Sequence, residues 1–204
     1  DGIDAVLVTH RHWDHFAASL VNDFLESNQD AVLIAPDQAV SDLGDVERFG
    51  DRVRSVKPEL HRFEMISLDD IEVQAYLLKH SSYMETDPAT GEEWDRHAGV
   101  QNLVYLVELA GHRFLHTGDA VFSQSLELFE NDRFEKVDLD LVFMEYFDWS
   151  EETAQVLENW MTPDHIVFMH LPPEKEKIEE LDAQLKQRFP QAVLFRESMQ
   201  VKEF

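Results

Sequence analysis

Cysteine is absent from this 204-residue sequence, and basic residues are scarce. Without thiols the chain forms no disulfide and has no thiolate nucleophile, so any transition metal must be held by His, Asp or Glu. Only 17 Lys and Arg stand against 42 Asp and Glu, which gives a formal net charge of −25. This charge repels phosphate backbones and argues against a nucleic-acid-binding surface. No apolar run approaches the roughly 20 residues of a membrane-spanning helix.

The remaining composition is typical of a globular protein, with 44% hydrophobic residues and 14 Phe. The length suffices for one domain with a substantial core, and we predict a single domain over residues 1–204. The expected partner is a small molecule, and the sequence does not indicate the oligomeric state. The acidic, cysteine-free composition favours export, for example to a periplasm, over a cytoplasmic location. Because the first residue is Asp1 rather than Met, we expect an N-terminal portion to be missing from this sequence.

Strands and helices alternate along most of the chain. Apolar runs and period-two alternation predict strands at residues 5–8, 31–35, 71–77, 102–109, 113–116, 139–145, 165–169 and 192–195. Helical periodicity predicts helices near residues 14–28, 37–43, 122–130, 151–161 and 174–189, the first capped by Asp14. Residues 45–59 and the long polar segment 81–99 are predicted loops, the second a candidate lid that carries a solvated His97. This order predicts a mixed α/β fold with helices packed outside the sheets.

Six residues that follow the first predicted strand are the strongest functional signal, His10-Arg11-His12-Trp13-Asp14-His15. They hold three imidazoles and one carboxylate, the ligands that zinc, iron and manganese bind, and core packing requires no such set. Further candidate ligands, His80, Asp119 and His170, follow other predicted strands, where side chains can project into one cleft. Together these seven residues suffice for two metal ions, with Asp119 as the bridge.

The segment Thr9–His15 resembles the HxHxDH signature of the metallo-β-lactamase superfamily. The later motifs are also present in order: His80, the turn His116-Thr117-Gly118-Asp119, and the strand-ending His170. This resemblance implies an αββα sandwich with the metals at one edge. Members of the family normally carry several strands before the HxHxDH loop, whereas this chain has almost none. We therefore expect those strands to be missing from this sequence rather than from the protein.

The resemblance also implies a ligand set. His10, His12 and His80 would bind the first metal; Asp14, His15 and His170 would bind the second, with Asp119 between them. The cofactors would be two divalent ions, zinc in the first place, with manganese or iron as alternatives. Two such ions activate a shared water as hydroxide, and Asp14 would be the catalytic residue that orients this water and accepts a proton.

Four further residues are candidates for supporting or substrate-contacting roles. His116 is either a hydrogen-bond partner behind the ligands or a packed strand residue. Trp13 is a candidate wall of the cleft, and Tyr83 and Trp94 are candidates for an apolar lid over the substrate. Ordinary packing is the alternative for all three aromatic residues.

The turn around Asp119 narrows the reaction class. Many true β-lactamases of the superfamily use Cys, or no bridging carboxylate, at that position. The sequence therefore resembles the lactonase- and phosphodiesterase-like branches, which include bacterial hydrolases. The predicted function is hydrolysis of a lactone, ester, thioester or phosphodiester bond by a hydroxide held at a dinuclear metal site. The alternatives are an oxidoreductase similar to single-iron sulfur dioxygenases, and a metal-binding protein without catalysis.

Overall fold

The structure, a computed structural model, describes residues 2–126, 129, 136–196 and 200–203. Contacts between residues group the chain into two compact units. The first unit comprises Asp1–Glu64, Ala75–Val104 and Asp119–Val121; the second comprises Met65–Gln74, Tyr105–Gly118 and Phe122–Phe204. The single domain over residues 1–204 therefore stays a prediction, and each unit is described by itself.

The first unit contains a small parallel sheet in the order β1-β2-β3, formed by β1 (Ala5–Leu7), β2 (Val32–Pro36) and β3 (Val53–Val56). Its helices are α1 (Ala18–Ser27), α2 (Asp37–Asp42) and the 3-10 helix η1 (Glu47–Arg52). The core of this unit joins Leu25 of α1, Leu33 of β2 and Ala39 of α2, all fully buried. Full burial of one such leucine contributes about 1.5–3 kcal/mol to the stability of the fold. This core therefore holds the end of β1 in place, where the loop with the candidate metal ligands begins.

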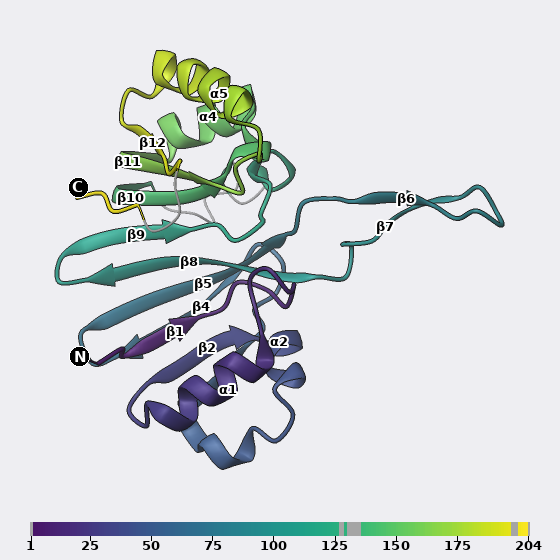
Figure 1. Cartoon of the computed structure of the whole chain (residues 1–204). Coiled ribbons are helices and arrows are strands. Elements are labelled where there is room, and N and C mark those ends of the chain that lie inside the picture. The colour runs from purple at the N-terminus through teal and green to yellow at the C-terminus, as the bar shows by residue number, and fades with distance from the viewer. Residues whose placement is uncertain (1, 127–128, 130–135, 197–199, 204) are drawn as a thin grey trace. The chain divides into compact units, whose positions relative to one another are not determined.

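An extended arm also belongs to the first unit, and Figure 1 shows it projecting from between β5 and β8. It contains β6 (Met84–Thr86) and β7 (Glu93–Asp95), which pair in antiparallel register with Glu85 opposite Trp94. We call residues 81–100 the β6–β7 arm. The prediction of a loop at 81–99 was wrong for these strands, because short polar strands carry no apolar alternation that would reveal them.

The larger sheet has seven strands in the order β12-β11-β10-β9-β8-β5-β4. They are β4 (Phe63–Leu68), β5 (Ile71–Lys79), β8 (Gln101–Leu109), β9 (His112–His116), β10 (Val137–Glu145), β11 (Met161–Met169) and β12 (Ala192–Leu194). Strands β8 and β9 form the predicted antiparallel hairpin, whereas β9 to β12 pair in parallel. Buried runs such as Ile166-Val167-Phe168 are typical of parallel strands covered on both faces.

The second unit contains the helices α4 (Glu151–Asn159) and α5 (Lys175–Arg188), and the 3-10 helices η2 (Phe122–Gln124) and η3 (Tyr146–Asp148). Helix α4 begins after Ser150, whose hydroxyl oxygen accepts a hydrogen bond from the backbone N–H of Thr153 at 3.1 Å. The alternation of strands and helices confirms the predicted mixed α/β fold. None of the helices in the described part of the chain has the length and apolar character that a membrane crossing requires.

Three local predictions need correction or lie beyond the described residues. Helix α1 begins at Ala18 rather than near residue 14, and its N-cap residue is Ala17, so Asp14 does not cap it. Residues 45–59 contain η1 and β3 rather than a loop alone. The helix predicted at 122–130 falls partly on residues 127–128 and 130, which lie outside the described residues.

The buried carboxyl group of Asp148, at the end of η3, leads us to predict that the stability of the second unit depends on pH. Burial raises the pKa of its carboxyl to about 7, although the carboxylate accepts a hydrogen bond from the Phe122 N–H at 2.8 Å. The folded-state pKa is above the ordinary value near 4, so the stabilisation is complete below pH 4 and is lost as the pH rises through 7.

We therefore expect the free energy of unfolding of the native chain, relative to Asp148→Asn, to fall by about 4 kcal/mol between pH 4 and pH 8. Urea unfolding of both proteins across this range measures the difference. A pH-independent difference would contradict a raised pKa at Asp148.

Candidate metal centre

The loop after β1 is fixed at its start by two backbone hydrogen bonds. The Val8 N–H donates to the carbonyl of Ile34 at 2.9 Å, and the Leu103 N–H donates to the carbonyl of Thr9 at 2.8 Å. His10, the next residue, is completely buried. The loop then turns on the His12 carbonyl, which accepts hydrogen bonds from the N–H groups of His15 and Phe16. This turn, rather than a helix start, places the ligand-type residues His12 to His15.

His80 and Asp119 are held next to each other by backbone pairing. His80 forms an isolated antiparallel bridge with Ala120, and the Ser81 N–H donates to the Asp119 carbonyl at 2.8 Å. The Asp119 N–H donates to Oδ1 of Asn102, a fully buried amide, at 3.0 Å. Sequence reasoning missed Asn102, although the two adjacent amides Gln101 and Asn102 at the start of a mostly apolar strand were a usable signal.

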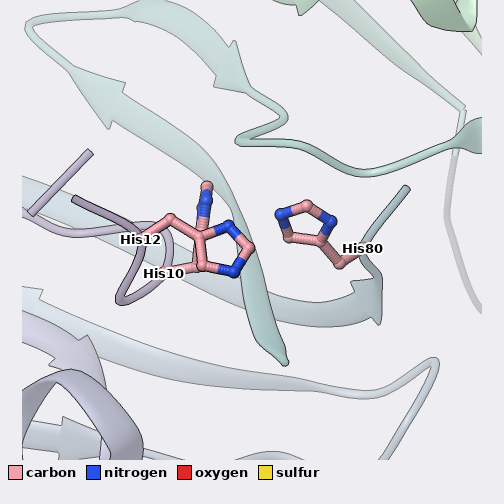
Figure 2. Close-up of side chains that lie close together, drawn as sticks. All are labelled: His10, His12 and His80. Carbon is pink, nitrogen blue, oxygen red and sulfur yellow. The ribbon is translucent and has the colours of Figure 1, made fainter. Parts of the chain in front are cut away.

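Three imidazoles converge in the first unit, as Figure 2 shows. The ring centroids of His10, His12 and His80 are all 4.7 Å from one another. Each ring offers one nitrogen, and these three nitrogens lie within 4.8 Å of one another. Zinc binds imidazole nitrogens at about 2.0–2.1 Å, so a small convergence of these rings would make three metal–nitrogen bonds. The predicted first-metal set thus gathers as one cluster.

Asp119 lies between this cluster and His15. Its Oδ1 is 3.1 Å from Nε2 of His15, whereas its Oδ2 is 3.5 Å from Nε2 of His80 and 3.9 Å from Nε2 of His10. His10, His15 and Asp119 also form a group whose ligand atoms lie within 4.8 Å of one another. The two carboxylate oxygens therefore face different histidines, which is the arrangement that a bridging ligand needs.

The electrostatics of the cluster favour neutral imidazoles. Burial, followed by the nearby His15, lowers the pKa of His10 to about 2. Burial is also the main reason why the pKa values of His12 and His80 are lowered. A neutral imidazole has a free nitrogen lone pair and is the form that binds a metal.

Hydrogen bonding shows which ring nitrogens are left for a metal. The Nδ1 of His80 lies 2.9 Å from the carbonyl oxygen of Ser81, so this nitrogen carries the proton and Nε2 is bare. Within the described residues, the buried Nε2 atoms of His10 and His80 have no hydrogen-bond partner. Buried polar atoms without partners are rare because they cost free energy, and metal ligation would satisfy both. The residues present therefore fit a metal ion.

Two predicted residues lie in the second unit. His116 ends β9, and its Nδ1 accepts a hydrogen bond from the Gly118 N–H at 3.1 Å while its ring stacks on Phe143. His116 thus fixes the turn before Asp119, and Gly118 adopts a φ of +57° that glycine tolerates best. His170 follows β11, and its ring centroid is 5.8 Å from that of Phe147. Its role as a second-metal ligand stays a prediction.

The other predicted site residues lie on the surface of the first unit. Asp14 is exposed beside His15, and its catalytic and ligand roles stay predictions. Trp13 is 88% exposed, and Tyr83 and Trp94 of the β6–β7 arm are about half exposed. The roles of these three aromatic side chains in substrate contact stay predictions. His97, by contrast, was predicted to be a solvated loop residue, but its ring packs against His12 and His80.

Residues 1–191 match the family model described as the beta-lactamase superfamily domain. The chain belongs to this superfamily. The match covers the HxHxDH loop, the Gly118-Asp119 turn and His170, and it confirms the family predicted from these motifs.

Individual members of the beta-lactamase superfamily agree with this assignment. A protein of Polaromonas sp. named UPF0173 metal-dependent hydrolase is 30% identical over 178 residues, which cover 82% of this chain and 60% of the relative. The chain thus spans about three fifths of the length of this relative.

Two solved structures show the same fold. The metallo-beta-lactamase fold protein YhfI from Bacillus subtilis has a TM-score of 0.59 at 15% identity, covering 95% of this chain and 74% of YhfI. Zn²⁺-bound PqqB from Methylobacterium extorquens also has a TM-score of 0.59 at 15% identity, covering 98% of this chain and 73% of PqqB. These likenesses confirm the predicted metallo-β-lactamase fold.

Proposed function

We propose that this chain is a metal-dependent hydrolase with a dinuclear metal site. The observation that carries the proposal is the position of Asp119, whose two oxygens face His15 on one side and His10 and His80 on the other. The buried Nε2 atoms of His10 and His80, which have no hydrogen-bond partner among the described residues, support it. The name of the Polaromonas relative, a metal-dependent hydrolase, is consistent with it.

The predicted ligands would form two metal-binding sets. His10, His12 and His80 would hold the first ion; Asp14, His15 and His170 would hold the second, with Asp119 shared between them. Two divalent cations supply a water whose pKa falls toward about 7 and a Lewis acid for the scissile group. Asp14, exposed at the turn, would orient that water and hold its proton. Nitrogen and carboxylate donors suit zinc first, with manganese or iron as alternatives.

The charges near the loop favour a substrate that is not a phosphodiester. Arg11, between two ligands, forms a two-point ion pair with Asp42 at 2.9 and 2.6 Å. Arg96 of the β6–β7 arm pairs with Glu85 at 3.2 Å. Because both guanidinium groups are already neutralised, neither offers an unpaired positive charge to a phosphate. Lys79, exposed next to His80, is a further cation near the site, so a lactone, ester or thioester is the first proposed substrate class and a phosphodiester stays the alternative.

The dioxygenase alternative needs one ion only. The two oxygens of Asp119 face different histidines, His15 on one side and His10 and His80 on the other, and this arrangement favours two ions over one. A metal-binding protein without catalysis would use the same ligands. Only a measurement of substrate turnover distinguishes it from a hydrolase.

A substrate screen of the zinc- and manganese-loaded protein tests the proposed reaction. We expect hydrolysis of γ-lactones, carboxylic esters or thioesters, and weaker or no cleavage of bis(p-nitrophenyl) phosphate. Removal of the metal by a chelator should abolish the activity, and re-addition should restore it. Metal-loaded protein that cleaves none of these compounds would contradict the hydrolase proposal, and oxygen uptake with persulfides would support the dioxygenase.

A further inference from the structure

A fourth imidazole, that of His97, lies beside the cluster of His10, His12 and His80. Its ring centroid is 4.7 Å from that of His12 and 4.4 Å from that of His80. These separations equal or fall below the 4.7 Å spacing among the three predicted ligands. His97 comes from the β6–β7 arm, which none of the superfamily motifs in this sequence includes.

One carbonyl orients both His80 and His97. The Nδ1 atoms of both rings lie 2.9 Å from the carbonyl oxygen of Ser81. A carbonyl oxygen only accepts hydrogen bonds, so each Nδ1 carries a proton and donates it. In a neutral ring the opposite nitrogen, Nε2, is then a bare acceptor. His97 therefore has the same tautomer as the predicted ligand His80.

The base of the β6–β7 arm holds His97 in place. Oδ1 of Asp95 accepts hydrogen bonds from the backbone N–H groups of Tyr83 and His97, both at 2.9 Å. Gln38 and Gln101 exchange two bonds, each backbone N–H donating to the other side-chain carbonyl at 3.0 Å. The Asp95 bonds close the base of the arm, the Gln38–Gln101 pair ties its end to α2, and the Ser81 N–H ties its start to the Asp119 carbonyl, so His97 is preorganised rather than free to move as a loop residue.

His97, like His12, is less buried than His10 and His80. His10 and His80 are buried, whereas the side chain of His97 is partly exposed at the edge of the cluster. Among the described residues, none donates a hydrogen bond to its Nε2. A fixed hydrogen-bond acceptor at the partly exposed edge of the histidine cluster is suited to bind a hydrogen-bond donor of a bound molecule.

We propose that Nε2 of His97 accepts a hydrogen bond from an O–H or N–H of the substrate, close to the scissile carbonyl. The preferred substrates are then uncharged esters or lactones that carry a hydroxyl or amide group near the carbonyl. This inference rests on the proposed hydrolase function and adds a specificity-determining residue to it. A site that accepts a donor of its substrate discriminates against analogues that lack it.

Binding of product-like carboxylates to the cobalt-loaded protein tests the inference without turnover. Butyrate and 3-hydroxybutyrate both offer a carboxylate to the metal, and only the second carries a hydroxyl donor. Titration of the cobalt absorption spectrum gives the dissociation constant of each compound. We expect the preference of the native protein for 3-hydroxybutyrate to fall about tenfold in His97→Phe, the effect of one net hydrogen bond. Because both proteins contain the metal, direct chelation by the hydroxyl cancels in this comparison.

Two further variants make the comparison specific. His97→Gln keeps an acceptor atom and should retain part of the preference. His112→Phe replaces an exposed histidine of the second unit, which pairs with Asp140, and should leave the preference unchanged. Circular dichroism of each variant verifies that the fold is intact.

Each remaining outcome decides a separate point. An unchanged preference in His97→Phe would overturn the role of His97 alone. Loss of cobalt, or an altered spectrum before any carboxylate is added, would also overturn it, because His97 would then be a metal ligand. No cobalt uptake by the native protein would overturn the metal centre itself, and the inference with it.

Discussion

Replacement of Asp119 by alanine is expected to remove at least one metal equivalent and to lower kcat/KM about a thousandfold, equivalent to about 4 kcal/mol of transition-state stabilisation. The reason is geometric, because the two oxygens of Asp119 lie 3.1 Å from Nε2 of His15 and 3.5 Å from Nε2 of His80. Without the Asp119 carboxylate, His10, His12 and His80 would still lie close together, but the proposed site would lose the ligand that its two ions share. Elemental analysis and steady-state kinetics on the substrate found in the screen measure both effects.

The matched control for this substitution is Asp164→Ala, which removes an exposed carboxylate of β11. It should retain full metal content and full activity. If Asp119→Ala also kept both, Asp119 would be only a turn residue, and the dinuclear proposal would be wrong.

Removal of the metal is expected to lower the melting temperature by roughly 8–16 °C. Metal at a thousand times its dissociation constant stabilises the folded state by about 4 kcal/mol, and each kcal/mol shifts the midpoint by about 2–4 °C in a chain of this size. The structural reason is that the buried Nε2 atoms of His10 and His80 have no hydrogen-bond partner among the described residues. Ligation satisfies both atoms at once. Calorimetry with and without EDTA measures the difference.

Two controls show whether this shift belongs to the histidine cluster. Calcium, which prefers oxygen ligands, should not restore the higher melting temperature, whereas zinc should. His80→Ala should make the melting temperature much less sensitive to zinc. Equal melting temperatures for the metal-free and zinc-loaded native protein would contradict a structural role of the metal.

The histidine cluster of the candidate metal centre was predictable because most of the predicted ligands lie close together in sequence. The loop from His10 to His15 directly follows a strand, so its side chains lie at the end of that strand. His80 and Asp119 also follow predicted strands, so the convergence of His10, His12 and His80 and the position of Asp119 follow from topology.

Other features are not visible in the apolar pattern or the residue types of the sequence. The turn on the His12 carbonyl delays α1 to Ala18, although Asp14 has the chemistry of an N-cap. A hydrogen bond from Nδ1 of His97 to the Ser81 carbonyl, which joins residues 16 positions apart, holds His97 beside the cluster, and this bond is not visible in a pattern of apolar residues. The polar strands of the β6–β7 arm were missed for the same reason.

The most direct test of the central claim is the metal content of the native protein. Purified chain is loaded with zinc, dialysed exhaustively against metal-free buffer, and analysed by mass spectrometry of its elements. Two zinc equivalents per chain are predicted, falling to one or fewer in Asp119→Ala. A native protein that retains no zinc, manganese or iron after such loading would contradict the metal centre and the hydrolase proposed from it.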